Sequence, residues 1–110
     1  MVYGNLDAVK RILNIDEDDV ESDEQLTDCQ VSAHGEVNNI LKSHGITTPL
    51  TSPDQNVKDA ENYFAASYFR ERNDSAEAEK LYNRGLHFLE TYMAADESDE
   101  IAFIVGVDTS

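Results

Sequence analysis

The stretch that decides the fold runs from Thr48 to Met93 and reads TPLTSPDQNVKDAENYFAASYFRERNDSAEAEKLYNRGLHFLETYM. It contains two helix starts of the same kind. In Ser52-Pro53-Asp54-Gln55 the serine can accept from first-turn amides, the proline sits where no N–H is needed, and the glutamine completes a capping box. Asp74-Ser75-Ala76-Glu77 repeats the pattern directly after Arg70-Glu71-Arg72-Asn73. The sequence therefore predicts two helices joined by almost no loop, which forces an antiparallel hairpin.

The helices of this hairpin are expected over Pro53–Arg72 and Ser75–Ala95. Each has apolar residues at steps of three and four, the spacing of a buried helix face. Gly85 lies inside the second helix, where glycine costs about 1 kcal/mol relative to alanine. We expect it to permit close approach of the first helix, near Ala65 and Ala66. The two predicted faces comprise Val57, Ala60, Tyr63, Phe64, Ala65, Ala66, Tyr68 and Phe69, and Ala78, Leu81, Tyr82, Gly85, Leu86, Leu89, Tyr92 and Met93.

Two further helices are predicted before the hairpin. Asn5 can cap a short helix over Leu6–Leu13. A longer helix is expected over Asp23–His44, and Gly45 follows it as a C-terminal stop. The apolar stripe of this longer helix comprises Leu26, Cys29, Ala33, Val37, Ile40 and Leu41.

The acidic run Asp16 to Glu24, DEDDVESDE, separates these two helices. We interpret it as a solvated linker that leads into a helix N-terminus, where negative charge suits the helix dipole. A calcium loop is the alternative. The run lacks the central glycine and the spaced ligands of an EF-hand, which argues against that alternative.

The C-terminal segment changes in character. After the acidic spacer Asp96–Glu100, Ile101–Val107 is apolar, β-branched and aromatic, which favours a strand. Because no second strand of comparable quality exists in the chain, we expect its backbone to pair with another protein by strand addition. An apolar tail packed on the bundle is the alternative. The predicted organisation is a helical bundle over 1–95 and a spacer with an extended docking segment over 96–110.

The chain of 110 residues has 23 acidic residues against 8 Lys and Arg, a net charge of −15. Such a surface repels DNA backbones and anionic membranes. The charge fits a protein adapted to molar salt, because at about 1 M salt the Debye length falls to about 3 Å and self-repulsion is screened. The longest apolar stretch, Ile101–Val107, is too short to cross a bilayer, so we expect no membrane span.

Residues that carry chemistry form no catalytic pattern. Cys29 is the only cysteine and lies on an apolar stripe, which favours a small buried side chain over a reactive thiol. His34 and His44 fall in the helix expected over Asp23–His44 and His87 falls in the last helix, without a metal-binding or catalytic spacing. We expect them to be ordinary surface or boundary residues. The sequence therefore predicts no enzyme, and no catalytic, cofactor-binding or metal-binding residue is assigned.

The layout resembles the head–tail connector adaptor (head-completion) proteins of tailed bacteriophages and tailed archaeal viruses. The resemblance covers about Leu6–Met93. It rests on an acidic start to a long helix, a loop containing Pro49, and the hairpin. The segments that carry it are Leu41-Lys42-Ser43-His44-Gly45, then Ala60, Ala65-Ala66 and Tyr68-Phe69-Arg70-Glu71-Arg72, then Ala76-Glu77-Ala78-Glu79-Lys80-Leu81-Tyr82.

The resemblance implies an all-α subunit of a homo-oligomeric ring of about a dozen copies. The ring would lie below the portal protein at the head–tail junction of the virion, after assembly in the host cytoplasm, and extend the DNA channel towards a tail-side connector protein. Genomic DNA would pass through without specific binding. The extended C-terminal segment of the family commonly docks on the portal. Carried over here, the docking residues are Ile101, Ala102, Phe103, Ile104, Val105, Gly106 and Val107.

The acid content is higher than is usual in that family, which fits a virus of a salt-loving archaeon. A second hypothesis is an acidic helical interaction module or DNA mimic that occupies a basic partner protein. A ring of many copies would support the connector, and a one-to-one complex with a nucleic-acid-binding protein would support the mimic.

Overall fold

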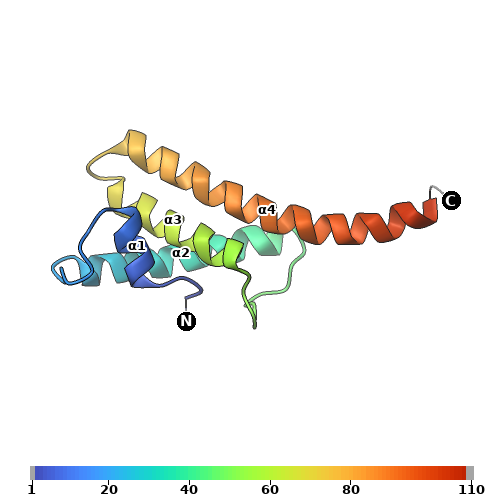
Figure 1. Cartoon of the computed structure of the whole chain (residues 1–110), viewed down its shortest axis with the longest axis horizontal. Helices are drawn as coiled ribbons and strands as arrows, with labels where there is room; N and C mark the ends of the chain where they lie inside the picture. The colour runs from blue at the N-terminus through green and yellow to red at the C-terminus, as the bar shows by residue number, and fades with distance from the viewer. Residues whose placement is uncertain (1, 109–110) are drawn as a thin grey trace.

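The computed structural model of the chain is a bundle of α-helices, as the sequence predicted (Figure 1). It describes the backbone of residues 2–108 and the side chains of residues 2–95. The elements within this part are α1 Leu6–Ile12, α2 Asp23–Ser43, α3 Gln55–Arg70 and α4 Ser75–Asp108.

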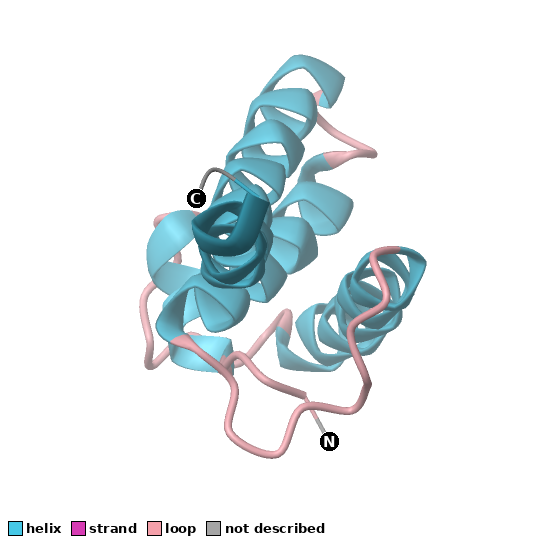
Figure 2. Ribbon diagram, turned by 90° about the vertical axis from the view of Figure 1, so that its right-hand side faces the viewer, coloured by secondary structure: helices cyan, strands magenta, loops and turns pink. Residues whose placement is uncertain are grey.

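Helix α3 is the centre of the bundle, because α1, α2 and α4 all pack against it. Figure 2 shows α2 and α4 on different sides of α3. Three of the buried residues of α3 are alanines, Ala60, Ala65 and Ala66. Small side chains allow neighbouring helices to approach closely, and larger buried residues fill the remaining space. Those larger residues include Phe64, Val57, Leu26, Val37, Leu41, Val9 and Leu89.

The predicted antiparallel hairpin is formed by α3 and α4, which run side by side with a short connection (Figure 1). The Asp74 carboxylate accepts from the N–H of Glu77 at 3.0 Å, as expected of a cap. The start of α3 differs from the prediction. Its cap is Asp54, which accepts from Asn56 N–H at 2.9 Å, so the helix begins after Ser52 and Pro53. An aspartate competes well with serine for this position, and here it is the residue that the chain uses.

The predicted stop of α2 at Gly45 is confirmed. Gly45 has φ +79°, a conformation that glycine adopts without strain. Its N–H donates to Lys42 O at 2.9 Å, and the next N–H, of Ile46, donates to Leu41 O at 2.9 Å. This pair of bonds is the Schellman motif, which satisfies the last carbonyls of the helix.

The prediction of a strand over Ile101–Val107 is wrong for the backbone, which continues α4 as far as Asp108. No strand occurs among residues 2–108. No proline interrupts the chain after Ser75, and the approach to the segment includes good helix formers such as Ala94, Ala95, Glu97 and Glu100. Without a partner strand, a helix also satisfies the backbone groups within the segment itself. The boundary proposed between residues 95 and 96 falls inside this helix, and the division into two units stays a prediction.

Candidate functional site

The predicted docking residues, Ile101 to Val107, lie on the last turns of α4. Figure 1 shows this part of the helix projecting beyond the bundle, and the molecule measures 59 × 29 × 20 Å. Their side chains lie outside the described residues. The backbone of α4 therefore carries the segment away from the core cluster described within residues 2–95.

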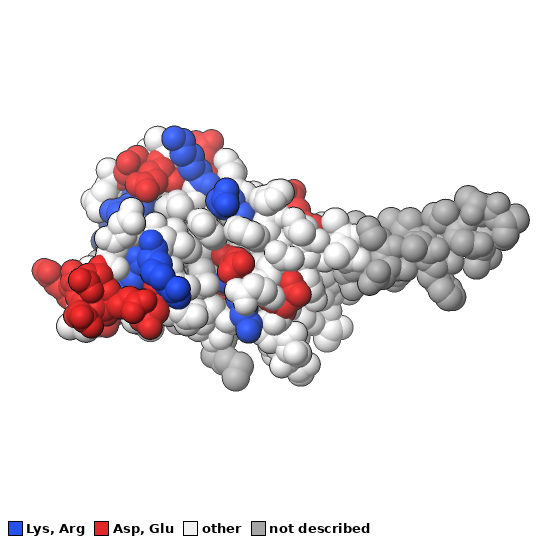
Figure 3. All heavy atoms as spheres, in the orientation of Figure 1, with Lys and Arg blue, Asp and Glu red and all other residues white. Residues whose placement is uncertain are grey.

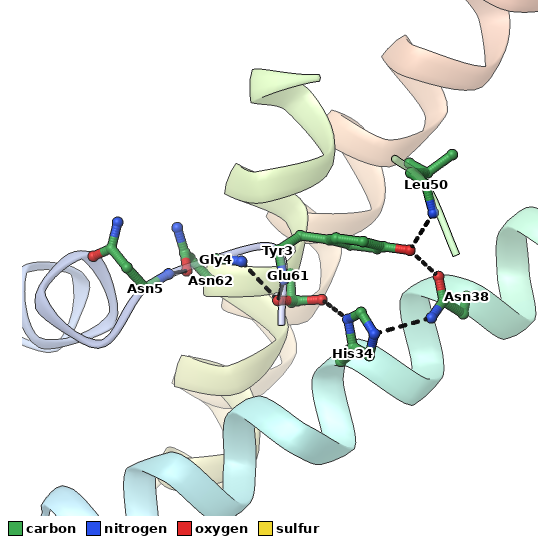
Figure 4. Close-up of polar contacts among 8 residues, drawn as sticks. All are labelled: Tyr3, Gly4, Asn5, His34, Asn38, Leu50, Glu61 and Asn62. Atoms are coloured by element: carbon green, nitrogen blue, oxygen red, sulfur yellow. Dashed lines mark hydrogen bonds and ion pairs between the residues drawn. The ribbon is translucent and has the colours of Figure 1, made fainter. Parts of the chain in front are cut away.

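The bundle contains a buried network of polar side chains that ties the N-terminal segment to α2 and α3 (Figure 4). Glu61 of α3 is 1 % exposed. One of its carboxylate oxygens accepts from the N–H groups of Tyr3 at 2.6 Å and Gly4 at 2.7 Å. The other oxygen lies 2.8 Å from His34 Nδ1. Glu61 is thus the buried acceptor on which this part of the chain converges.

The network continues from His34 through Asn38 to the loop that follows α2. His34 Nε2 lies 3.2 Å from Asn38 Nδ2, and Asn38 Oδ1 accepts from the Tyr3 hydroxyl at 2.7 Å. That hydroxyl in turn accepts from Leu50 N–H at 2.8 Å. One assignment of protons satisfies every contact, with the His34 proton on Nδ1 and the Asn38 amide donating to Nε2.

This arrangement gives His34 and Glu61 a structural role in the folded state. A catalytic His–Glu pair needs a free position for a reacting atom. Here both ring nitrogens of His34 and both carboxylate oxygens of Glu61 already have protein partners. His34 is therefore a boundary residue, as expected, although its central place in a network was not foreseen. The side chain also packs edge-on against the Tyr3 ring, with centroids 4.4 Å apart.

The other two histidines lie elsewhere, as their spacing predicted. His44 caps the end of α2, where Nδ1 lies 3.1 Å from Ile40 O. His87 is exposed on α4 beside Phe88, with ring centroids 6.2 Å apart. The structure does not bring the three histidines together.

The acidic loop between α1 and α2 is organised around a lysine. Lys10 is 2 % exposed, and its ammonium donates to Glu17 O at 3.2 Å and to Asp19 O at 2.7 Å. Asp23 Oδ1 lies 2.6 Å from the same nitrogen. The ammonium thus makes two hydrogen bonds to carbonyl oxygens and one ion pair. The loop thus folds around an internal cation, and no cluster suited to a metal ion occurs among the described residues.

Figure 3 shows the resulting charge distribution. Acidic atoms gather at the end of the molecule where the loop between α1 and α2 lies, and Lys and Arg atoms form separate patches on the adjoining face. Positive groups are scarce in this chain, with 8 Lys and Arg in all. Their position is therefore informative about where an acidic partner could bind.

A groove of about 480 Å³ opens between α1, α3 and α4. Its apolar walls include Ala8, Ile12, Tyr63 and Phe88, and its charged lining consists of Arg11, Lys58 and Asp59. Tyr63 and Phe88 stack with ring centroids 5.6 Å apart. The Arg84 guanidinium lies 5.8 Å from the Tyr63 ring and 5.7 Å from the Phe88 ring, within cation–π distance. The groove thus combines apolar walls with nearby positive charge.

Two tyrosines near the middle of the bundle have perturbed titration. The Tyr82 hydroxyl donates to Glu36 at 2.6 Å, and this bond, together with burial, raises the pKa of Tyr82 to about 12. Burial, reinforced by the Glu36 carboxylate, also raises the pKa of Tyr68.

The single cysteine also has a shifted pKa. Burial and the nearby Asp28 raise the pKa of the Cys29 thiol, although Arg72 opposes them. Cys29 is free and half-buried rather than fully buried as the sequence predicted, and a raised pKa lowers the reactivity of a thiol.

Sequence reasoning missed the buried roles of Lys10 and Glu61. A signal for Glu61 was present, because it falls on the buried stripe of α3 between Ala60 and Phe64. Lys10 adjoins the buried Val9 of α1. The pattern could mark both as charged groups on a buried face, but it could not name partners that lie in other segments.

Within the part of the chain that the structure describes, no helix has the length and apolarity needed to cross a bilayer. Comparisons of the chain with protein-family models, with curated proteins and with solved structures find no significant match.

Proposed function

We propose that this protein is a structural subunit of a viral head–tail connector. In this role it forms a ring below the portal, extends the DNA channel and joins it to the tail. The observation that carries the proposal is the shape of α4. Its backbone leaves the bundle and carries the apolar segment 101–107 outward, where it can reach a second protein (Figure 1).

The docking mode differs from strand addition, because the segment is helical. A helix presents an apolar face to a groove on its partner and satisfies its own backbone groups. The docking residues of the proposal are unchanged: Ile101, Ala102, Phe103, Ile104, Val105, Gly106 and Val107. The partner is the portal protein, as the resemblance to connector adaptors implies.

The charge of the subunit also suits a DNA channel. A net charge of −15 repels the phosphate backbone, so DNA can pass without being held. The same charge supports the proposal that the host of the virus lives in molar salt. Self-repulsion in the bundle weakens as salt screens it, so the midpoint of thermal unfolding should rise between about 0.1 and about 3 M KCl. A flat or falling midpoint would remove the salt-loving host from the proposal and leave the connector in place.

Deletion of residues 101–110 tests the docking role. The described core ends at Met93, so the truncated chain should keep the helix content of residues 2–95 and unfold cooperatively. It should fail to co-purify with portal rings at molar salt, whereas the full chain binds. Deletion of Thr109 and Ser110 alone is the matched control and should bind as the full chain does.

Two outcomes would contradict the docking role. If the truncated chain unfolds, the segment belongs to the core of its own subunit. If it folds and still binds portal rings with the affinity of the full chain, the portal contacts another surface.

A further inference from the structure

Val20 is an apolar side chain held outward at the tip of the most acidic loop. It is 69 % exposed, and its neighbours in the chain are Asp18, Asp19 and Glu21. A single exposed valine is common on protein surfaces and by itself needs no explanation. The loop that carries Val20, however, is fixed rather than loose.

The fixing group is Lys10. Its ammonium binds the carbonyl oxygens of Glu17 and Asp19, the second of which directly precedes Val20. Two local bonds tighten the same loop: Asp18 N–H donates to Asp16 Oδ1 at 3.0 Å, and Glu21 N–H donates to Asp19 Oδ1 at 3.0 Å. A tip that is already ordered loses little entropy on binding. The loop therefore presents one apolar side chain between carboxylates in a defined geometry.

The groove between α1, α3 and α4 has the complementary character. Its apolar walls, Ile12, Tyr63 and Phe88, can enclose a small branched side chain. Lys58 and Arg11 line the same groove together with one acid, Asp59, and Arg84 lies over the two aromatic rings. Arg11 also pairs with Glu17 of its own chain at 3.7 Å, so Lys58 and Arg84 are the cations best placed for a second copy. Three of the 8 cationic side chains thus lie at or beside one groove in a chain with 23 acids.

From this match we infer that the groove binds the Val20 tip of the loop of a second copy of this chain. The valine enters between the apolar walls, and the carboxylates of Asp18, Asp19 and Glu21 face the cations of the groove. Within one chain the loop contacts the groove only at its edge, where the Glu17 carboxylate lies 3.7 Å from Arg11, and Lys10 holds the loop with Val20 exposed. Charge complementarity gives the contact its orientation, and the apolar contact survives at high salt.

The contact joins two different surfaces, the loop of one copy and the groove of the next. Such a heterologous interface closes into a ring when its rotation permits, and otherwise gives an open filament. The inference deepens the proposed connector by naming the surfaces between neighbouring subunits. It leaves the C-terminal part of α4 free for the portal.

Sedimentation equilibrium at about 1 M KCl, at chain concentrations up to about 1 mM, tests the interface, because a contact this small is weak between two free copies. The average mass of the natural chain should rise with concentration. Val20→Asp and Lys58→Glu should each weaken association at least about tenfold. Val31→Asp is the matched control, since Val31 is 63 % exposed on α2, away from the loop and the groove. Lys42→Glu is the matched charge control.

Mixing separates this interface from a general loss of folding. Val20→Asp has an intact groove, and Lys58→Glu has an intact loop. An equimolar mixture of the two should therefore form a one-to-one pair, while each alone stays monomeric. The inference is overturned if the natural chain stays monomeric over the whole range, if Val20→Asp associates normally, or if the mixture forms no pair. None of these results bears on portal docking by residues 101–107, so the two failures are distinguishable.

Discussion

The ring of Phe64 lies against Gly85 so closely that a Cβ atom at position 85 would come within 2.7 Å of Phe64 Cδ1 and Cε1, and within 3.1 Å of Ala60 O. The sequence predicted a close approach of the two hairpin helices at Gly85, and the structure confirms it. The contact residues are Ala60 and Phe64 rather than the expected Ala65 and Ala66. Phe64 has little room to yield, because its other neighbours include Tyr82, whose ring centroid is 4.8 Å away.

Gly85→Ala should therefore destabilise the protein although alanine favours helix. Overpacking costs about 1–3 kcal/mol, and the gain in helix propensity offsets about 1 kcal/mol of it. Gly35→Ala is the matched control, because nothing lies within 4 Å of a Cβ at that position in α2. It should raise the free energy of unfolding by about 0.5–1 kcal/mol. Urea unfolding measures the free energy of unfolding of both variants. The close packing at Gly85 would be contradicted if Gly85→Ala and Gly35→Ala changed this free energy in the same direction.

Lys10→Met should destabilise the acidic loop. The substitution keeps most of the apolar stem and removes the ammonium, which leaves Glu17 O, Asp19 O and Asp23 without their shared donor. We expect the free energy of unfolding to fall by about 2–3 kcal/mol. This is less than the usual cost of breaking a fully buried ion pair, because Asp23 is 33 % exposed. Lys42→Met, at an exposed position, should change stability by less than about 0.5 kcal/mol. Equal effects of the two substitutions on the urea midpoint would exclude the proposed role of Lys10.

These residues show what the sequence can and cannot predict. Gly45 and the Asp74 cap act through neighbours in the chain, so their local patterns predicted the end of α2 and the start of α4 correctly. Glu61 acts through Tyr3 and Gly4, far away in the chain, and only the folded arrangement brings these groups together. The strand over 101–107 was wrong because a short β-branched, apolar run is compatible with either a strand or a buried helix.

Glu61→Gln should loosen the N-terminal segment. An amide cannot accept on both sides, so either the Tyr3 and Gly4 N–H groups or His34 Nδ1 would lose an acceptor. We expect the free energy of unfolding to fall by about 1–3 kcal/mol, and amide hydrogen exchange at Tyr3 and Gly4 to become faster. Glu79→Gln, an exposed change on α4, should affect neither. Unchanged exchange at Tyr3 and Gly4 in the Glu61 variant would show that the buried carboxylate does not hold them.

Stability should fall in alkaline solution through Tyr82. The pKa of Tyr82 is about 12 in the folded chain against an ordinary value of 10.0, so folding favours the protonated form. The stabilisation is complete below about pH 10 and is lost as the pH rises towards about 12. Tyr82→Phe should reduce the slope of stability against pH in this window. Some slope should remain, because the pKa of Tyr68 is raised as well. If the natural chain and Tyr82→Phe showed the same slope of stability against pH, the predicted effect of the Glu36–Tyr82 bond would be contradicted.

An image of the assembled particle in molar salt, by electron cryomicroscopy, tests the central claim most directly. We predict a ring of about a dozen copies of this bundle below the portal, with residues 101–107 of each α4 seated on the portal protein and the DNA channel passing through the ring. A one-to-one complex of the bundle with a basic nucleic-acid-binding protein, and no ring at the head–tail junction, would contradict the connector and support the acidic mimic instead.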